Sequence, residues 1–302
     1  MNVIKADATQ FAEIRDFPFQ PNFIEYDGVS IHYVDEGPEN PKGTFLLGHG
    51  EPSWSYLYRD WIGPLNEAGY RCIAVDLPGF GKSDKPTSRD WYTYERHCGA
   101  LRAVIDALDL RDIHLVVQDW GGAIGLRQAV DQPERFARLF IFNTTVWHEG
   151  VTYSPRLWEW MKKCDDPESF GHDMPVGQIV FAAMKRGGHD PALVSSAFDA
   201  PFTTPESKAG AQAFPYLIPF GLRENAETGS DHNRIFETLK LWQSCPVHLI
   251  FGDADEVYPW EWAETWAAMI PQATLDRIDG GGHFVQFDAA DDCVAAILSH
   301  LK

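Results

Sequence analysis

The chain has 302 residues, of which 44% are hydrophobic and 13% aromatic, a composition typical of a globular protein with a large core. Its formal net charge of −19 argues against binding to nucleic acid or to anionic membranes, because both need clustered Lys and Arg. No apolar run approaches the roughly 20 residues of a membrane span, and Met1–Asp7 lacks the basic and apolar segments of a secretory signal, so we expect a cytoplasmic protein.

Strand patterns open the chain and then alternate with helical patterns. Residues 29–35 alternate apolar and polar side chains, as in a half-buried antiparallel strand. The helix predicted at 94–108 places Leu101, Val104, Ile105 and Leu108 on one face. The other predicted elements, in chain order, are a strand at 44–47, a helix at 56–68, strands at 72–75 and 113–117, a helix at 123–130 and a strand at 139–142.

This alternation stops after Asn143 and resumes near residue 230. The segment 147–226 contains mostly helical patches, such as 157–163 and 176–184, among aromatic residues, Pro and Gly, and no convincing strand. Beyond it the predicted elements are a helix at 233–242, a strand at 247–251, a helix at 261–269, a strand at 274–278 and a helix at 289–301. We predict an α/β core of residues 1–146 and 227–302 with an inserted helical cap of residues 147–226. Ligands of open α/β sheets bind at the carboxyl ends of the strands, where such a cap would cover them.

Metal binding is not expected. The five cysteines are odd in number, scattered and without CxxC spacing, and no histidine pair has HExxH spacing. We therefore predict reduced thiols and no metal.

Asp119 follows an apolar β-branched run and precedes Trp120, Gly121 and a helical pattern. This strand–turn–helix arrangement is typical of a nucleophile elbow, where the usual residue is Ser. A serine that attacks a saturated carbon would form a stable ether, whereas a carboxylate forms an ester that activated water can hydrolyse. Asp119 therefore predicts displacement at an sp³ carbon; capping of the following helix is the alternative role.

Three further loops follow predicted strands and supply candidate partners. In the loop of residues 48–52, the backbone N–H of Glu51 would form an oxyanion hole with that of Trp120. The Glu51 side chain either orients water or is an ordinary acidic loop residue, and His49 is interpreted as structural. The loop at 252–256 offers a carboxylate to orient a histidine, with Asp255 preferred over Asp253. His283, after three glycines, is the predicted general base.

The order Asp119, Asp255, His283 is that of the α/β-hydrolase triad. The motifs around these residues are His49–Arg59, Asp76–Pro86, Val117–Gly121 and Gly282–Gln286, with Asp199–Phe202, Ala209–Gly210 and Ala213–Pro215 in the predicted cap. Together these motifs resemble the haloalkane dehalogenases. The fold implied is a mostly parallel eight-stranded sheet flanked by helices, with a helical cap. Residues 142–145, where some relatives carry the acid, contain no carboxylate, which favours Asp255.

The resemblance implies hydrolysis of small neutral haloalkanes to primary alcohol and halide without a cofactor. Asp119 would displace halide to give an alkyl ester, which water activated by His283 would hydrolyse. Trp120 would bind the halide together with a cap tryptophan, Trp160 in preference to Trp158. We further expect a monomer.

Other functions compete with this one. An epoxide hydrolase shares the Asp nucleophile and usually needs two cap tyrosines, for which Tyr153 and Tyr216 are available. A fluoroacetate-type dehalogenase is disfavoured because such enzymes resemble this chain but carry Arg after the nucleophile, where this chain has Trp120. A β-lactone-cleaving relative and a non-catalytic ligand-binding protein of this fold are the remaining alternatives.

Overall fold

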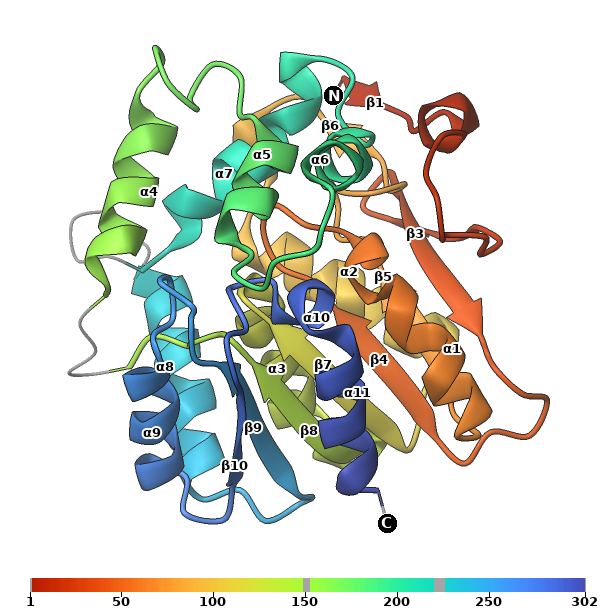
Figure 1. Cartoon of the computed structure of the whole chain (residues 1–302), viewed down its shortest axis with the longest axis vertical. Helices are drawn as coiled ribbons and strands as arrows, with labels where there is room; N and C mark the ends of the chain where they lie inside the picture. The colour runs from red at the N-terminus through yellow and green to blue at the C-terminus, as the bar shows by residue number, and fades with distance from the viewer. Residues whose placement is uncertain (1, 149–152, 220–225, 302) are drawn as a thin grey trace.

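A computed structural model describes residues 2–148, 153–219 and 226–301, and its centre is a twisted eight-stranded sheet (Figure 1). The strand order is β10-β9-β8-β7-β4-β5-β3-β2. The strands from β10 to β5 are parallel, and β3 and β2 extend the sheet in antiparallel pairing. Every residue of β4, β7 and β9 is buried, as expected for parallel strands covered on both faces. The strands are β2 (Asn22–Tyr26), β3 (Val29–Glu36), β4 (Thr44–Gly48), β5 (Arg71–Val75), β7 (Ile113–Gln118), β8 (Phe136–Phe142), β9 (Val247–Gly252) and β10 (Thr274–Ile278), with β1 (Val3–Ile4) and β6 (Lys85–Pro86) forming a separate small sheet.

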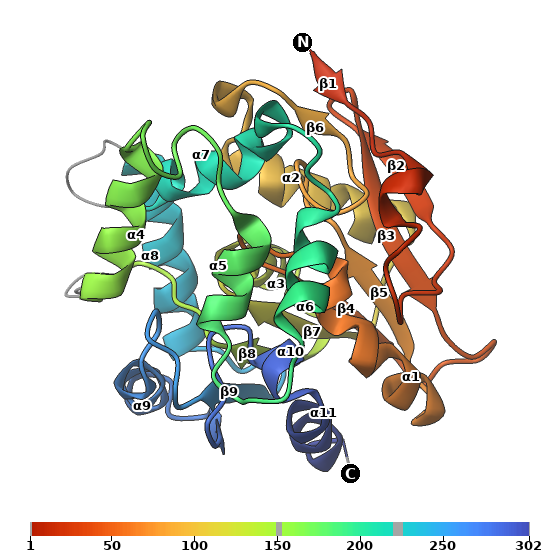
Figure 2. The same ribbon diagram turned by 45° about the horizontal axis from the view of Figure 1, so that its top comes forward.

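Helices cover the sheet and its upper end. Helix α1 packs against α11, while α3 packs between α2 and α8. Helices α4 to α7 lie between β8 and α8 in the chain and gather at one end of the sheet, as Figures 1 and 2 show. The α-helices are α1 (Arg59–Glu67), α2 (Tyr94–Ala107), α3 (Trp120–Asp131), α4 (Pro155–Asp165), α5 (Val176–Ala183), α6 (Pro191–Asp199), α7 (Ala209–Leu217), α8 (Ala226–Lys240), α9 (Trp260–Met269), α10 (Val285–Asp288) and α11 (Ala290–Ser299).

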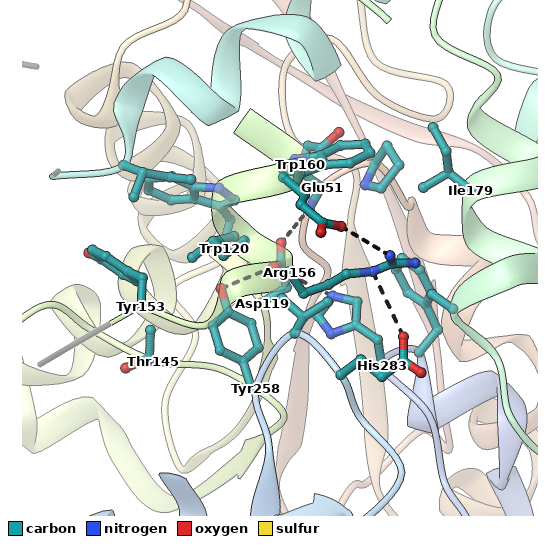
Figure 3. Close-up of a pocket in the computed structure, with 18 of the residues that line it drawn as sticks. Glu51, Asp119, Trp120, Thr145, Tyr153, Arg156, Trp160, Ile179, Tyr258 and His283 are labelled. Carbon is teal, nitrogen blue, oxygen red and sulfur yellow. Dashed lines mark hydrogen bonds and ion pairs between the residues drawn. The ribbon is translucent and has the colours of Figure 1, made fainter. Parts of the chain in front are cut away.

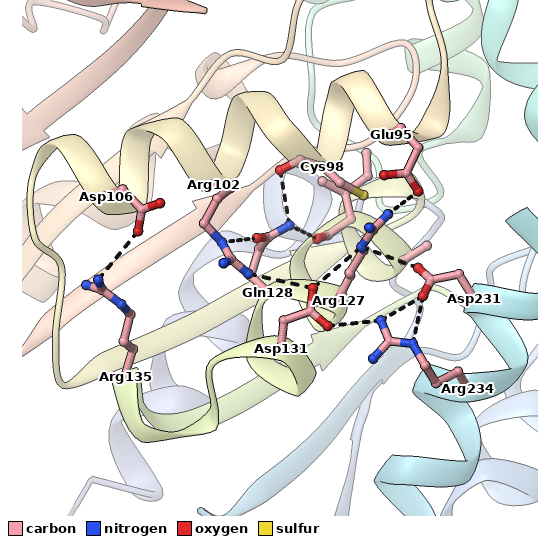
Figure 4. A network of polar contacts seen from close by, with 12 residues as sticks. Glu95, Cys98, Arg102, Asp106, Arg127, Gln128, Asp131, Arg135, Asp231 and Arg234 are labelled. Carbon is pink, nitrogen blue, oxygen red and sulfur yellow. Dashed lines mark hydrogen bonds and ion pairs between the residues drawn. The ribbon is translucent and has the colours of Figure 1, made fainter.

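A network of ion pairs connects α8 to α2 and α3 (Figure 4). Arg234 of α8 contacts Asp131 of α3 at 3.0 Å and Asp231 at 2.7 Å. Arg127 of α3 contacts Asp231 at 3.6 Å and Glu95 of α2 at 2.5 Å. A single exposed ion pair contributes little to stability, but this connected set links α2, α3 and α8 to one another.

The α/β architecture predicted from the sequence is confirmed, and the differences lie at element boundaries. Helix α3 begins at Trp120 rather than at residue 123, because Gly121 and Gly122 lower helix propensity locally and hide the first turn. Helix α8 begins at residue 226 rather than 233, and a short helix that was not predicted, α10, precedes α11. The short strands β1, β2 and β6 were not predicted individually. No helix in the described part of the chain has the length and apolar character needed to cross a bilayer.

Candidate active site

Asp119 lies on the sharp turn between β7 and α3. Its backbone has φ 50° and ψ −130°, a conformation that costs a non-glycine residue free energy and is typical of functional turns. Its side chain makes no capping hydrogen bond to α3, so the structure gives the capping alternative no support. The backbone N–H of Asp119 donates to the carbonyl of Asn143 at 3.0 Å, and Thr144 Oγ1 donates to the carbonyl of Asp119 at 2.5 Å. The neighbouring loop after β8 therefore holds the turn from both sides.

The glycines around the turn are required by close packing. A Cβ on Gly121 would lie 2.5 Å from the carbonyl oxygen of Gly48, and one on Gly122 would overlap Thr144. A Cβ on Gly50 would overlap the Asp119 carboxylate itself. These small residues allow β4, β7 and α3 to approach closely enough to bring the Glu51 backbone to the nucleophile.

The two oxygens of the Asp119 carboxylate have different neighbours. Oδ1 accepts a 2.8 Å hydrogen bond from the backbone N–H of Glu51. Oδ2 lies 3.6 Å from Nε2 of His283 and accepts a 3.4 Å hydrogen bond from the hydroxyl of Tyr258. Figure 3 shows these groups converging on Asp119. The Trp120 N–H, the second predicted oxyanion donor, belongs to the first residue of α3, directly after this carboxylate.

His283 lies between two carboxylates. Its Nδ1 is 3.0 Å from Asp255 Oδ2, opposite the Nε2 that faces Asp119. Burial lowers the pKa of His283, but Asp255 and Asp119 outweigh it and raise this pKa to about 10. Asp253, the alternative acid, instead pairs with Arg277 and accepts from the Gly280 N–H at 2.6 Å. The structure thus brings Asp255 to the histidine and leaves Asp253 outside the site.

Asn143 holds Asp255 in place through hydrogen bonds, a role that was not predicted from the sequence. Its Nδ2 donates to Asp255 Oδ2 at 2.8 Å, and its Oδ1 accepts from the Gly252 N–H at 2.9 Å. Asp255 Oδ1 in turn accepts from the Val257 N–H at 2.7 Å. The carboxylate of Asp255 is therefore fixed by donors on both oxygens. Some relatives carry the acid of the triad at residues 142–145, and this chain has Asn143 there instead. That difference was the sequence signal that could have pointed to Asn143.

His49 and Glu51 differ in their surroundings. His49 is fully buried, with Nδ1 2.8 Å from the Gly50 carbonyl and Nε2 accepting from the Leu77 N–H at 3.0 Å. These contacts agree with a structural role. The Glu51 side chain is buried at the cavity wall, and burial together with the nearby Asp119 charge raises the pKa of Glu51 well above its usual range. Its Oε1 has no hydrogen-bond partner among the described residues.

A cavity of about 350 Å³ lies over Asp119 and is walled by both the core and the helices above it. Trp120 and Trp160 both line it, and both are labelled in Figure 3. Trp158, the alternative halide donor, is not among the lining residues. Trp147 of the loop after β8 adds a third indole to the wall, which the sequence did not suggest. Indole N–H groups are donors only, so this wall suits an anion in an otherwise apolar space.

The tyrosines at the cavity differ from the expectation for an epoxide hydrolase. Tyr153 lines the cavity, whereas Tyr216 is not among its lining residues. Tyr258, from the loop between β9 and α9, lines the cavity instead and contacts the nucleophile. No sequence pattern marked Tyr258.

Charged side chains surround the outer part of the cavity. Arg156 of α4 lies 3.5 Å from Glu159 and 3.8 Å from Glu256, and Lys185 lies 3.1 Å from Glu256. Lys163 also lines this region. These groups are exposed, so their ion pairs are weak and sensitive to salt. Residues 2–148, 153–219 and 226–301 contain no cluster of His, Cys, Asp and Glu that could hold a metal ion.

Comparison with known proteins agrees with this geometry. Residues 43–187 match the model of the alpha/beta hydrolase fold family. The chain is 37% identical to a haloalkane dehalogenase of Psychrobacter cryohalolentis over 96% of its own length and 95% of that protein. It is 34% identical to a haloalkane dehalogenase of Mycolicibacterium paratuberculosis, with 99% and 98% covered. A solved tetrameric haloalkane dehalogenase from Paraglaciecola agarilytica superposes with a TM-score of 0.90 at 31% identity, covering 99% of this chain and 98% of that one. The chain belongs to the haloalkane dehalogenases, within the alpha/beta hydrolase fold family.

Proposed function

We propose that this haloalkane dehalogenase converts small neutral haloalkanes and water to primary alcohol and halide in two steps, through an alkyl ester of Asp119. One observation carries the proposal: a buried carboxylate on a strained turn has one oxygen held by the Glu51 N–H at 2.8 Å and the other facing His283 at 3.6 Å. Such a carboxylate can attack carbon and then be regenerated by water.

In the first step, Asp119 Oδ2 attacks the halogen-bearing carbon and the carbon–halogen bond breaks. The departing halide is bound by the indole N–H of Trp120 and by that of Trp160. Both residues line the cavity, and donors already in place stabilise the developing anion without reorganisation.

In the second step, His283 removes a proton from water, which attacks Cγ of the ester. The resulting oxyanion at Oδ1 is stabilised by the Glu51 N–H and the Trp120 N–H. Collapse of the intermediate breaks the Cγ–Oδ2 bond, and the alcohol leaves with the proton held by His283. Asp255, fixed by Asn143 and Val257, orients the histidine and stabilises its charged form.

Alkylation of Asp119 also changes the pKa of His283, the general base. The pKa of His283 is raised to about 10 in part by the charge of Asp119. Because the ester is neutral, this contribution disappears when Asp119 is alkylated, and the pKa of His283 falls. Alkylation of Asp119 therefore favours the neutral form of His283, which is the form that accepts a proton from water.

Two other activities have a specific observation in their favour. Tyr153 and Tyr258 line the cavity and could serve epoxide opening, although Tyr216 is not at its wall. The chain is also 30% identical, over 94% of its length, to a Shewanella oneidensis cis-3-alkyl-4-alkyloxetan-2-one decarboxylase. Both substrates would require the same Asp119.

The discriminating experiment compares wild type and Asp119→Asn with 1,2-dibromoethane, styrene oxide and a cis-3,4-dialkyl β-lactone. Bromide release by the wild type, abolished in Asp119→Asn, is expected. Diol formation or lactone cleavage without bromide release would overturn the proposal.

We also propose that residues 147–226 form a cap on a core of residues 1–146 and 227–302, and that the protein is a cytoplasmic monomer. Residues of α4 and α5 on the cavity wall support the cap. The Paraglaciecola relative is tetrameric, so light scattering after size-exclusion chromatography is the direct test of the monomer.

A further inference from the structure

The two-step scheme assigns no role to Tyr258, although its side chain contacts the nucleophile. It lies three residues after Asp255, in the loop between β9 and α9, and its side chain is buried. Its ring packs against those of His283 and Trp262, with centroids 5.6 and 5.7 Å away. This packing directs the hydroxyl to Asp119 Oδ2, 3.4 Å away, as the dashed line in Figure 3 shows.

The two carboxylate oxygens of Asp119 have different tasks, and Tyr258 contacts only one of them. Oδ1 is engaged by the Glu51 N–H at 2.8 Å, a donor placed for an oxyanion. Within the described part of the chain, Oδ2 has only the longer contacts to Tyr258 and His283, and is therefore the oxygen that attacks carbon. After attack, Oδ2 is the ester oxygen that carries the alkyl group.

The chemistry of the second step makes this oxygen important. When the tetrahedral intermediate collapses, the electron pair of the Cγ–Oδ2 bond passes to Oδ2, which departs as an alkoxide. A simple alkoxide is a poor leaving group and needs a hydrogen-bond donor as its charge develops. The proton that it finally takes comes from His283, which received it from water.

We propose that Tyr258 is a further catalytic residue, whose hydroxyl donates a hydrogen bond to the alkoxide oxygen as it leaves Asp119. The inference rests on the proposed two-step function and assigns a donor to its leaving oxygen. Tyr258 keeps its own proton throughout, so the balance of protons stays with water and His283. A contact of 3.4 Å in the free enzyme shortens as charge develops, as catalytic hydrogen bonds commonly do.

The same hydrogen bond acts in opposite directions on the two steps. Donation to Oδ2 before attack makes that oxygen less nucleophilic, whereas donation during collapse stabilises negative charge. Burial and the Asp119 charge raise the pKa of Tyr258 well above its usual range, which keeps the hydroxyl a donor at all working pH values. Removal of the hydroxyl should therefore leave alkylation unchanged or faster and should slow ester hydrolysis.

The test is rapid-quench kinetics of Tyr258→Phe, with Tyr153→Phe as the matched control because it removes another buried phenol from the same cavity wall. With 1-bromobutane, we expect Tyr258→Phe to keep its bromide burst and to hydrolyse the ester about 10- to 100-fold more slowly, the effect of one hydrogen bond to a charged group. With 1-bromo-3,3,3-trifluoropropane the loss should be smaller, because the more acidic alcohol needs less help to leave. Tyr153→Phe should show no such dependence on the leaving alcohol.

Ester hydrolysis at the wild-type rate in Tyr258→Phe, or an equal loss with both bromides, would overturn the proposal. If Tyr258→Phe does not fold, replacement of Tyr258 by 3-fluorotyrosine gives the opposite test, since its stronger donor should accelerate ester hydrolysis of the non-fluorinated substrate. A failure of the two-step function itself is seen separately: His283→Gln would then form no covalent adduct on Asp119, whatever Tyr258→Phe does.

Discussion

The side-chain amide of Asn143 donates a 2.8 Å hydrogen bond to Asp255, on the oxygen that lies 3.0 Å from His283. The carbonyl of Asn143 also accepts the backbone N–H of Asp119 at 3.0 Å. One residue at the end of β8 thus connects the nucleophile turn with the acid that orients the base. Its backbone has φ 23°, a region that disfavours most side chains other than Asn and Asp.

Removal of this amide should affect the hydrolytic half of the reaction most. In Asn143→Ala, Asp255 loses a donor and we expect ester hydrolysis to slow about 10-fold, with about 1–3 kcal/mol lost in the free energy of unfolding. Asn143→Gly removes the same side chain, but glycine adopts a positive φ without strain. This variant should therefore be more stable than Asn143→Ala and should hydrolyse the ester just as slowly. Rapid-quench kinetics and urea denaturation measure the two effects. Full recovery of the rate in Asn143→Gly would show that the amide has no role in the chemistry.

His283→Gln should separate the two steps. Halide displacement needs no base, so the variant should release one equivalent of bromide from 1,2-dibromoethane and then stop. Mass spectrometry of the intact protein should find the bromoethyl group, and peptide mapping should place it on Asp119. Sustained turnover by His283→Gln would contradict the role of the histidine as base.

Alkylation should release a proton from His283. The pKa of this residue is about 10 in the free enzyme, so it is charged at pH 8 and should lose its proton when the Asp119 charge disappears. In a weakly buffered burst experiment, a pH indicator should report this proton together with the bromide. His283→Gln should give the bromide burst without the proton.

The same residue predicts how stability depends on pH. A folded pKa of about 10, above the ordinary histidine pKa of about 6.5, stabilises the native state fully below pH 6.5, and this stabilisation is lost as pH rises toward 10. The melting temperature of the wild type should therefore fall between these pH values more steeply than that of His283→Gln. Parallel curves for the two proteins would contradict the raised pKa.

Trp160→Phe and Trp158→Phe form a matched pair on α4. Only Trp160 lines the cavity, so Trp160→Phe should weaken binding of bromide by about 10-fold and lower kcat/KM, because a buried anion loses one donor. Trp158→Phe should change neither value by more than about twofold. Quenching of the intrinsic tryptophan fluorescence by bromide gives the affinity, and a larger loss in Trp158→Phe would reverse the assignment.

The close approach at the nucleophile turn can be tested with two glycines. Gly121→Ala would place a Cβ 2.5 Å from the carbonyl oxygen of Gly48, and we expect a loss of about 1–3 kcal/mol in the free energy of unfolding. Gly63 lies in α1, where a Cβ would meet nothing within 4 Å, so Gly63→Ala should be neutral or slightly stabilising. Equal effects of the two substitutions, measured by urea denaturation, would contradict the packing argument.

Periodicity and motif order predicted most of the fold and the main residues of the site. The buried runs that became β4, β7 and β9 are unambiguous. Asp119 follows β7, Asp255 follows β9 and His283 follows β10, so their meeting at the carboxyl ends of the strands could be foreseen. Trp160 was preferred over Trp158 on the family resemblance, and it is the one that lines the cavity. The chemical roles of Asp119, Asp255, His283 and Trp160 remain predictions.

Contacts between distant loops could not be predicted in this way. Asn143 and Tyr258 have no periodic pattern around them, and their importance depends on the distance to residues that are far apart in the chain. The start of α3 was also hidden, because Gly121 is required by the approach of Gly48 in β4 and Gly122 by the approach of Thr144, while both oppose local helix propensity. Tertiary packing decided each of these features.

The central claim is the covalent ester on Asp119, and isotope incorporation in a single turnover tests it most directly. Excess enzyme reacted with 1,2-dibromoethane in H₂¹⁸O should yield 2-bromoethanol without ¹⁸O, while one ¹⁸O atom enters the carboxylate of Asp119, because water attacks Cγ and the alcohol leaves with Oδ2. Single-turnover alcohol that carries ¹⁸O, with an unlabelled Asp119, would show that water attacks the substrate directly and would contradict the mechanism.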